Sequence, residues 1–382
     1  MMTIPFHRPQ ITNEEIESVV DSLKKGWITM GEKTIEFEKQ FSRYMGMPHA
    51  VAVNSCTAAM HLALKAIGLK ENDEVIVPVM TFASAAETVL YFNARPVFCD
   101  VNPQTHCILP EDIERKISKK TRAIIPVHYG GQPADIDEIR SLAGGNIAVI
   151  EDAAHSLPAW YKGEMIGRQG DITCFSFYAT KTLTTGEGGM AVTSNGEWAE
   201  RMRRLRLHGI SSDAWKRYTA AGTWKYDVVE VGYKYNTTDM NSALGLGQLE
   251  RVEEMRDARA RIAGLYDATF GKCPGILPYC VKEDRISAWH LYPLRLDLEM
   301  LAITRDEFIE EMKSRGISTS VHFIPMYHFT YYKNFGLMAG DYPGAEWVFE
   351  RMVSLPIYPS MTDAEIGYVI DNVIDIVSHR LR

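Results

Sequence analysis

Two side chains able to do covalent and electrostatic chemistry follow apolar runs in the middle of the chain. Asp152 comes directly after Ile147–Glu151, and Lys181 follows the aromatic run Phe175–Tyr178. A carboxylate leaving a buried strand can meet a ligand, and a lysine beside apolar residues can act as an amine nucleophile. Each has an ordinary alternative, because Asp is a favoured helix N-cap and most lysines are solvated surface residues.

Two further segments add groups that could hold a flat, phosphorylated molecule. Ser55 and Thr57 lie between a predicted strand and a predicted helix, where free N–H groups and the helix dipole suit a phosphate, although plain N-capping explains them equally well. Phe82 could stack on a ring or belong to the core. The glycines of Gly186–Gly189 allow close approach to the backbone.

Taken together, these residues supply an amine, a carboxylate, a stacking ring and a phosphate cradle. Pyridoxal phosphate needs those four groups, for its aldehyde, pyridine nitrogen, ring and phosphate respectively. The chain contains no Gly-x-Gly-x-x-Gly, Walker, His-Glu-x-x-His or Gly-x-Ser-x-Gly motif, which removes the usual support for dinucleotide, ATP, zinc-protease and hydrolase functions. Its six cysteines form no Cys-x-x-Cys pair, so we expect free thiols and no metal site.

The composition sets limits on partners and location. The 382 residues are 46% hydrophobic and 24% charged, and 41 Lys and Arg against 49 Asp and Glu leave a net charge of −8. This balance argues against nucleic acid as a partner. No run of about 18 apolar residues and no secretory leader pattern is present, so we expect a cytoplasmic protein that does not span a membrane.

Short β-branched runs alternate with helix-period segments from about residue 49, a pattern typical of an α/β protein with a mostly parallel sheet. Seven strands are predicted, at Ala50–Val53, Glu74–Val79, Pro96–Asp100, Ala123–Val127, Ile147–Glu151, Ile172–Phe177 and Met190–Thr193. The helices between them are predicted at Ala58–Ile67, Ser84–Tyr91, Pro110–Ile117 and Ala134–Leu142.

The pattern changes after residue 195. A basic helix at Glu197–Leu207, a connection rich in Trp and Tyr at Trp215–Tyr235 and one long charged helix at Thr238–Phe270 are expected. The arginines of the basic helix are predicted to form a solvated face rather than a nucleotide site. A smaller α+β domain should follow, with strands at Ala288–Leu296 and Ser318–Phe323 and helices at Arg305–Arg315, Gly344–Met352 and Ala364–Ser378. We therefore predict a large domain (1–240), a linking helix (241–280) and a small domain (281–382).

Several segments, in the right order, resemble the sugar aminotransferases of the DegT/DnrJ/EryC1/StrS family over nearly the whole chain. They are Gly26–Gly31, Glu151–His155, Ser176–Phe177 with Lys181, Glu187–Gly189 and Gly232–Asn236. The resemblance implies the aspartate-aminotransferase fold, known as fold type I of the pyridoxal-phosphate enzymes. The chain departs from the family in having Cys56 between Ser55 and Thr57, and Tyr178 after Ser176–Phe177.

The resemblance also implies a role for each site residue. Lys181 would bond covalently to the cofactor, Asp152 would pair with the pyridine nitrogen, and Phe82 and His155 would lie on opposite sides of the ring. The phosphate contacts would fall on Thr57, Ala58 and Ser176, with Asn236 reaching the site of the neighbouring subunit in a homodimer.

The expected function is transfer of an amino group from glutamate to a 4-keto nucleotide-linked deoxysugar, in making cell-surface polysaccharide or lipid A sugars. Within the family, the chain looks most similar to the enzymes that make UDP-4-amino-4-deoxy-L-arabinose, while other 4-keto sugars stay open. Two alternatives are a pyridoxal-phosphate sugar dehydratase, which in this family carries His in place of Lys181, and a regulatory protein that keeps the fold without catalysis.

Overall fold

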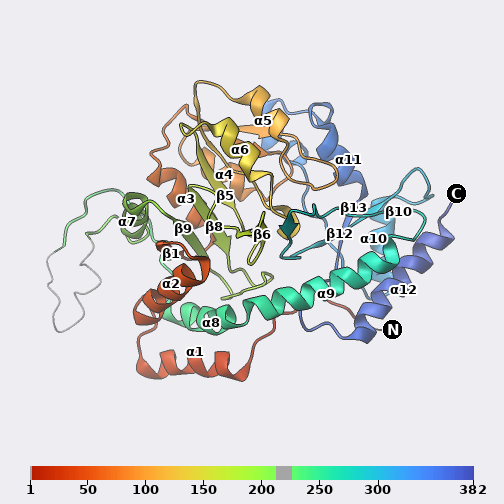
Figure 1. Cartoon of the computed structure of the whole chain (residues 1–382), viewed down its shortest axis with the longest axis horizontal. Coiled ribbons are helices and arrows are strands. Elements are labelled where there is room, and N and C mark those ends of the chain that lie inside the picture. Colours follow the sequence, from red (N-terminus) through yellow and green to blue (C-terminus); the bar gives the residue numbers. More distant parts are fainter. Residues whose placement is uncertain (1, 212–225) are drawn as a thin grey trace.

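The computed structural model describes residues 2–211 and 226–382, and a seven-stranded sheet lies at the centre of its larger part (Figure 1). The strand order is β1-β9-β8-β5-β4-β2-β3. The strands are β1 (His49–Val53), β2 (Glu74–Pro78), β3 (Arg95–Cys99), β4 (Thr121–Ile124), β5 (Ala148–Asp152), β8 (Ile172–Ser176) and β9 (Gly189–Thr193). Neighbours pair in parallel from β8 through β5, β4 and β2 to β3, whereas β9 pairs antiparallel with both β1 and β8.

This sheet confirms the predicted α/β class and its mostly parallel pairing. All seven predicted strands are present, with ends that differ by up to three residues. Their apolar runs lack a polar alternation because helices cover both faces of the sheet, so most strand residues are buried. A parallel sheet gathers the carboxyl ends of its strands at one edge, and this edge carries the site described below.

Helices from the first 205 residues pack on this sheet, on each other or, in the case of the first helix, on a later helix at Asp239–Glu250. They are α1 (Asn13–Lys25), α2 (Glu32–Met45), α3 (Cys56–Ala66), α4 (Ser84–Leu90), α5 (Pro110–Lys116), α6 (Ile136–Ala143) and α7 (Gly196–Leu205), with a short 3₁₀ turn at Tyr129–Gly131. The α3 helix is the most deeply embedded, because its small and apolar residues allow it to lie against the sheet with nearly every side chain buried.

The single long helix predicted for Thr238–Phe270 is wrong. Two helices, α8 (Asp239–Glu250) and α9 (Val252–Phe270), meet at Arg251, whose backbone leaves the helical region at φ −111° and ψ 5°. Arg251 Nη1 donates to the buried Glu15 Oε1 at 3.0 Å, which fixes the corner against α1. From there α8 lies on α1 and α2, while α9 runs toward the C-terminal part of the chain (Figure 1).

A second hydrophobic cluster forms around a small three-stranded sheet in the order β10-β12-β13. Its strands are β10 (Ile276–Leu277), β12 (Tyr292–Leu296) and β13 (Met352–Leu355), and a further small sheet joins β6 (Trp160–Tyr161), β7 (Glu164–Met165) and β11 (Arg285–Ile286). The helices of this part are α10 (Arg305–Ser314), α11 (Pro343–Arg351) and α12 (Asp363–His379), with 3₁₀ turns at Met326–His328, Tyr332–Phe335 and Ala339–Asp341.

Two of the strands expected here need correction. The first begins only at Tyr292, because the preceding residues form a loop in which Ala288 N and Leu291 N donate to carbonyl oxygens of the Tyr129–Gly131 turn. The second, Ser318–Phe323, makes only one isolated bridge, from Ser320 to Ser354. Both segments were apolar enough for a strand, but their backbone groups bond elsewhere.

The domain boundaries near residues 240 and 280 stay a prediction, as does the cytoplasmic location. The predicted connection Trp215–Tyr235 lies partly outside the described residues. Within the described ranges, none of the helices has the length and apolar character needed to cross a membrane.

Candidate active site

A cavity of about 630 Å³ lies at the carboxyl edge of the large sheet, beside the start of α3. This size falls within the range typical of small-molecule sites. Six of the predicted site residues line it: Thr57, Phe82, Asp152, His155, Ser176 and Lys181. Further lining residues come from the N-terminal segment and from the C-terminal part of the chain, namely Phe6, His290, Ser320, His322 and Phe323.

Asp152 is the last residue of β5, and its carboxylate is buried on the floor of the cavity. Its Oδ1 accepts a hydrogen bond from Ala154 N at 3.0 Å and lies 3.8 Å from the Cys56 thiol. Burial raises the pKa of Asp152, while the Ala154 N–H and the Lys181 amine oppose that shift. The residues that directly follow Asp152 form no helix, so the helix-capping alternative fails, and the carboxylate can meet a cationic ligand atom.

Lys181 lies in the turn that follows β8, and its backbone N–H donates to Tyr178 O at 2.9 Å. The Lys181 side chain, half-buried as a whole, lines the same cavity as Asp152. Burial is the main reason that the pKa of Lys181 falls to about 8, with the charge of Asp152 opposing this shift. A substantial fraction of the amine is therefore neutral near pH 8, as a nucleophile requires.

The start of α3 forms the end of the cavity predicted to hold a phosphate. Ser55 caps the helix, with its side chain accepting from Ala58 N at 3.1 Å, and Thr57 lines the cavity. Ala58 itself is not among the lining residues. A Cβ on Gly189 would lie only 2.4 Å from the Ser55 carbonyl carbon, so this glycine lets β9 approach the start of α3. The glycines of Gly186–Gly189 were expected to allow a close approach to the backbone. At Gly189 the group that approaches is the backbone of Ser55 and Cys56.

Aromatic rings form two sides of the cavity. Phe82 is 61% exposed although it is apolar, which rules out the core alternative and leaves a ring open for stacking. The imidazole of His155 is buried, stacks at 5.7 Å on Phe323, and accepts from Gly130 N at 3.3 Å through Nδ1. Burial holds the pKa of His155 well below its usual value, so the ring is neutral.

Several residues that line the cavity, among them His290 and His322, were not among the predicted site residues. His290 was expected to pack within a strand, but its Nε2 lies 3.4 Å from Lys181 Nζ. The two residues are 109 positions apart, so no local pattern could have signalled the contact. His322 also lines the cavity, where its Nδ1 lies 2.9 Å from Ser354 Oγ, and burial lowers its pKa to about 4.

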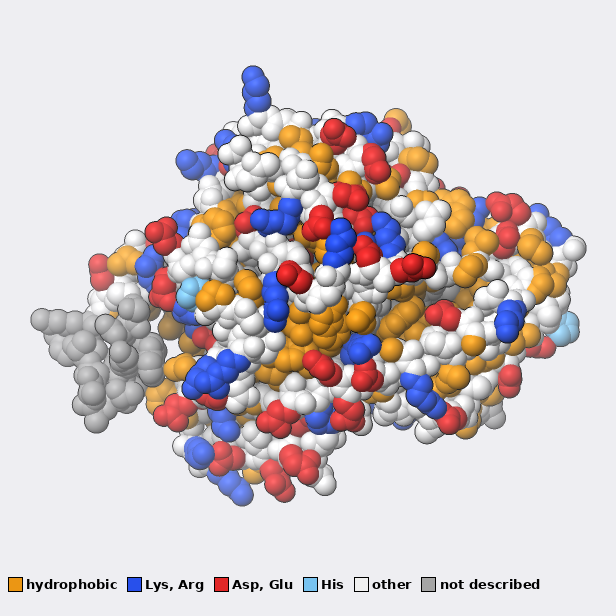
Figure 2. All heavy atoms as spheres, in the orientation of Figure 1, with side chains coloured by type: hydrophobic (Ala, Val, Ile, Leu, Met, Phe, Trp, Pro, Cys, Tyr) orange, Lys and Arg blue, Asp and Glu red, His pale blue; other side chains and the backbone are white. Residues whose placement is uncertain are grey.

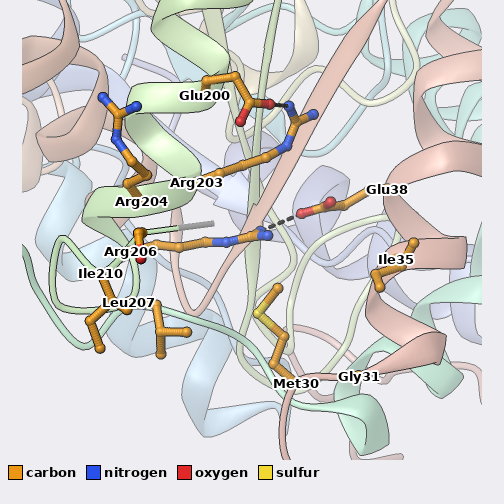
Figure 3. A pocket seen from close by; sticks show the side chains of 11 residues that line it. Met30, Gly31, Ile35, Glu38, Glu200, Arg203, Arg204, Arg206, Leu207 and Ile210 are labelled. Carbon is orange, nitrogen blue, oxygen red and sulfur yellow. Dashed lines mark hydrogen bonds and ion pairs between the residues drawn. The ribbon is translucent and has the colours of Figure 1, made fainter. Parts of the chain in front are cut away.

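Three arginines at the end of α7 and just after it, Arg203, Arg204 and Arg206, line a separate pocket of about 290 Å³ (Figure 3). Arg206 is buried, forms an ion pair with Glu38 and donates to Ala52 O at 2.7 Å, so the predicted solvated face is wrong for this residue. Arg203 bonds to Glu200 and to a β1 carbonyl. These contacts attach α7 to α2 and β1.

The groups gathered in the larger cavity fit pyridoxal phosphate. This cofactor requires four groups around one space, and the cavity has them. They are the amine of Lys181, the buried carboxylate of Asp152, the exposed ring of Phe82 and the start of α3. A profile of the DegT/DnrJ/EryC1/StrS aminotransferase family matches residues 9–374. The chain belongs to this family. It is also 46% identical to the spore coat polysaccharide biosynthesis protein SpsC of Bacillus subtilis, over 98% of this chain and 97% of SpsC.

Solved structures agree with this assignment. Spr1654 from Streptococcus pneumoniae has a TM-score of 0.93 and 35% identity, covering 99% of this chain and 100% of its own, and it is also known in a form with pyridoxal phosphate. PseC of Helicobacter pylori, an aminotransferase involved in the biosynthesis of pseudoaminic acid, has a TM-score of 0.91 and 25% identity over 99% and 100% of the two chains. The protein therefore has the fold type I architecture.

Membership in the DegT/DnrJ/EryC1/StrS family makes the protein a sugar aminotransferase that uses pyridoxal phosphate, with a keto-sugar and an amino donor as its substrates. The bound cofactor withdraws electrons from the carbon that carries the transferred nitrogen. The residues of the protein hold and orient the cofactor and the substrates, and they supply the protons that the reaction needs.

Asn236 does not line the cavity. Its Nδ2 donates to Thr237 O at 3.0 Å, and its buried Oδ1 has no hydrogen-bond partner within the described part of the chain. The backbone beside it is fixed, because Tyr235 O accepts from Asn54 N at 2.8 Å. Within one chain, Asn236 is therefore separate from the other predicted site residues.

Proposed function

We propose that this aminotransferase moves the amino group of glutamate to the keto carbon of a nucleotide-linked 4-keto deoxysugar, and that the product is used for cell-surface polysaccharide or lipid A sugars. The observation that carries the proposal is that Lys181 and Asp152 border one cavity, whose lining also includes the polar side chains of Ser320 and His322. The similar protein SpsC is named for spore coat polysaccharide biosynthesis, which supports a use of the product in cell-surface polysaccharide.

Each site residue then has a proposed role. Lys181 binds the cofactor aldehyde and, when free, carries protons as a neutral base. Asp152 keeps the pyridine nitrogen protonated, since a carboxylate stabilises a nearby cation. Phe82 and His155 hold the ring from its two sides. The phosphate contacts are assigned to Thr57, Ala58, Ser176 and Asn236.

The working form is proposed to be a homodimer in which Asn236 completes the site of the partner subunit. Two observations support this arrangement: Asn236 does not line the cavity of its own chain, and its buried Oδ1 has no hydrogen-bond partner within the described residues. Apolar side chains are exposed on α1, notably Ile16 and Leu23, and Figure 2 shows an apolar patch near the centre of one face. Surfaces of this kind suit contact with a second copy.

A dehydratase is less compatible with this site, because the family's dehydratases resemble this chain but carry His where it has Lys181. Lys181 also lies where an amine can reach the cavity.

The test is a panel of UDP-, dTDP- and GDP-linked 4-keto deoxysugars incubated with the loaded enzyme and glutamate. We expect an amino sugar and an equal amount of 2-oxoglutarate, and neither with Lys181→Ala. Loss of water from the sugar without glutamate consumption would instead identify a dehydratase. Conversion of the cofactor to its amine form by glutamate with no amino sugar from any panel member would contradict the proposed acceptor, and no conversion at all would indicate the regulatory alternative.

A further inference from the structure

His290 lies at the amine that reacts, although nothing in its sequence context indicated this. Its Nε2 is 3.4 Å from Lys181 Nζ, and its ring centre is 4.3 Å from that of His155. The side chain is buried, and its Nδ1 has no hydrogen-bond partner within residues 2–211 and 226–382. A residue needed only for packing would be better served by an apolar side chain, since a buried imidazole nitrogen without a partner has an energetic cost.

We propose that His290 is a further catalytic residue, which hydrogen-bonds to Lys181 Nζ whenever the amine is free of cofactor and so holds it in position to move protons. When the amine takes up a proton, an Nζ–H donates to Nε2 of the neutral imidazole. When the proton returns to the substrate, the contact keeps Nζ in place. No atom is gained or lost by His290, whose role is to orient and stabilise the charged amine.

The loop that carries His290 is held from two directions. On one side, Ala288 N and Leu291 N each donate at 3.1 Å to carbonyls of Gly131 and Gly130. A Cβ on Gly131 would lie 2.7 Å from Trp289 N, so only glycine lets the loop approach this closely. Trp289 itself adopts φ 49°, a left-handed conformation that is costly for a bulky residue and persists only where the surroundings enforce it.

On the other side, Arg259 of α9 holds the carbonyl of His290. Its Nη1 donates to His290 O at 3.3 Å and to Ile357 O at 2.7 Å. Arg259 is 0% exposed, and burial lowers its pKa to about 9. A fully buried guanidinium that bonds backbone carbonyls fixes the loop rigidly, so Arg259 is a positioning residue for His290.

Other groups also set the charge state of Lys181, and a test must leave them unchanged. Asp152 favours the charged amine, whereas burial and Arg259 favour the neutral one. The titratable side chains that face this region are His7, Cys56, Asp152, His155, Tyr178, Glu187, Arg259 and His322. A variant at His290 alone therefore reports on the contact with Nζ.

The experiment measures the pKa of Lys181 in the cofactor-free enzyme by competitive acetylation at a series of pH values, with peptide masses as the readout. Exposed Lys70 serves as the internal reference. In His290→Phe we expect the pKa of Lys181 to fall by about one pH unit, because the ammonium loses an acceptor. His290→Gln, whose Oε1 can accept at the same reach, should keep the original value.

The loaded enzyme gives the second readout. We expect His290→Phe to lower kcat about 100-fold with little change in the KM for glutamate, and His290→Gln to recover most of the loss. An unchanged Lys181 pKa in folded His290→Phe would overturn the inference, as would equal loss in both variants. The inference rests on Lys181 as the reacting amine of the proposed function. Because the acetylation experiment needs no sugar substrate, its result does not depend on whether any sugar of the panel is converted.

Discussion

Asp152 and Lys181 share one cavity, and burial shifts the pKa of each toward its neutral form. For the lysine this shift is useful, because a neutral amine is the nucleophile and the base. For the aspartate it is opposed by the Ala154 N–H, by the charge of Lys181 and by the Cys56 thiol. A cationic pyridine nitrogen beside Asp152 would favour the carboxylate further.

The charge of Asp152 can be removed without changing its size. Asp152→Asn should lower kcat by a factor of about 10² or more, since a positioned charge commonly contributes that much to a chemical step. The measurement is steady-state kinetics at saturating cofactor, with bound cofactor quantified. A kcat within about threefold of the original would show that Asp152 serves only the local turn.

The lowered pKa of Lys181 predicts how cofactor capture depends on pH. Only the neutral amine attacks the aldehyde, so the rate at which the cofactor-free enzyme bonds pyridoxal phosphate should rise about tenfold per pH unit below pH 8. Above a pKa of about 8 it should level off. Stopped-flow absorbance measures this rate, and a continued rise to pH 10 would mean that the amine keeps its ordinary pKa.

At the scale of elements, the sheet could be predicted because each strand is a short apolar run between turn residues. The position of Asp152 at the end of β5 could also be predicted, because Asp152 directly follows the apolar run of that strand in the sequence. His290 could not be predicted this way. Its loop takes shape only when Ala288 and Leu291 bond to the Tyr129–Gly131 turn, which comes from a distant part of the chain. The break at Arg251 has the same origin, in its contact with Glu15.

The junction of β9 with the start of α3 gives an element-scale prediction. Gly189→Ala would place a Cβ 2.4 Å from the Ser55 carbonyl carbon and 2.7 Å from Cys56 N, and both are backbone atoms that cannot easily move away. We expect a loss of stability of about 2 kcal/mol, visible as a lower thermal midpoint, and weaker retention of the cofactor phosphate.

Gly264→Ala is the matched control for this substitution. Gly264 occupies an exposed position of α9, and no atom outside the helix itself lies within 4 Å of the place a Cβ would take, so alanine there should stabilise by about 0.5–1 kcal/mol. Equal effects of the two variants would contradict the close approach of β9 to α3.

At the scale of the whole molecule, the account depends on whether one chain or two form a site. Lys181→Ala removes the reacting amine, and Asn236→Ala at limiting cofactor should leave its sites mostly empty. In mixed dimers of a shared architecture, one site would carry both defects and the other neither. Random pairing should then restore up to about a quarter of the original activity, because half of the dimers are mixed and each has one intact site of two.

The control for mixing is each variant refolded alone, which should stay inactive under the same conditions. If heterodimers form and activity does not return, Asn236 belongs to the site of its own subunit or to none.

The central claim is that Lys181 is the amine that bonds the cofactor, and reduction of the loaded enzyme with borohydride tests it most directly. The reduced bond survives proteolysis, so peptide mass mapping identifies the modified lysine. The account predicts a phosphopyridoxyl group on Lys181 alone, and its loss when excess glutamate is added before reduction. A label on another lysine, or a label on Lys181 that glutamate does not diminish, would contradict the account.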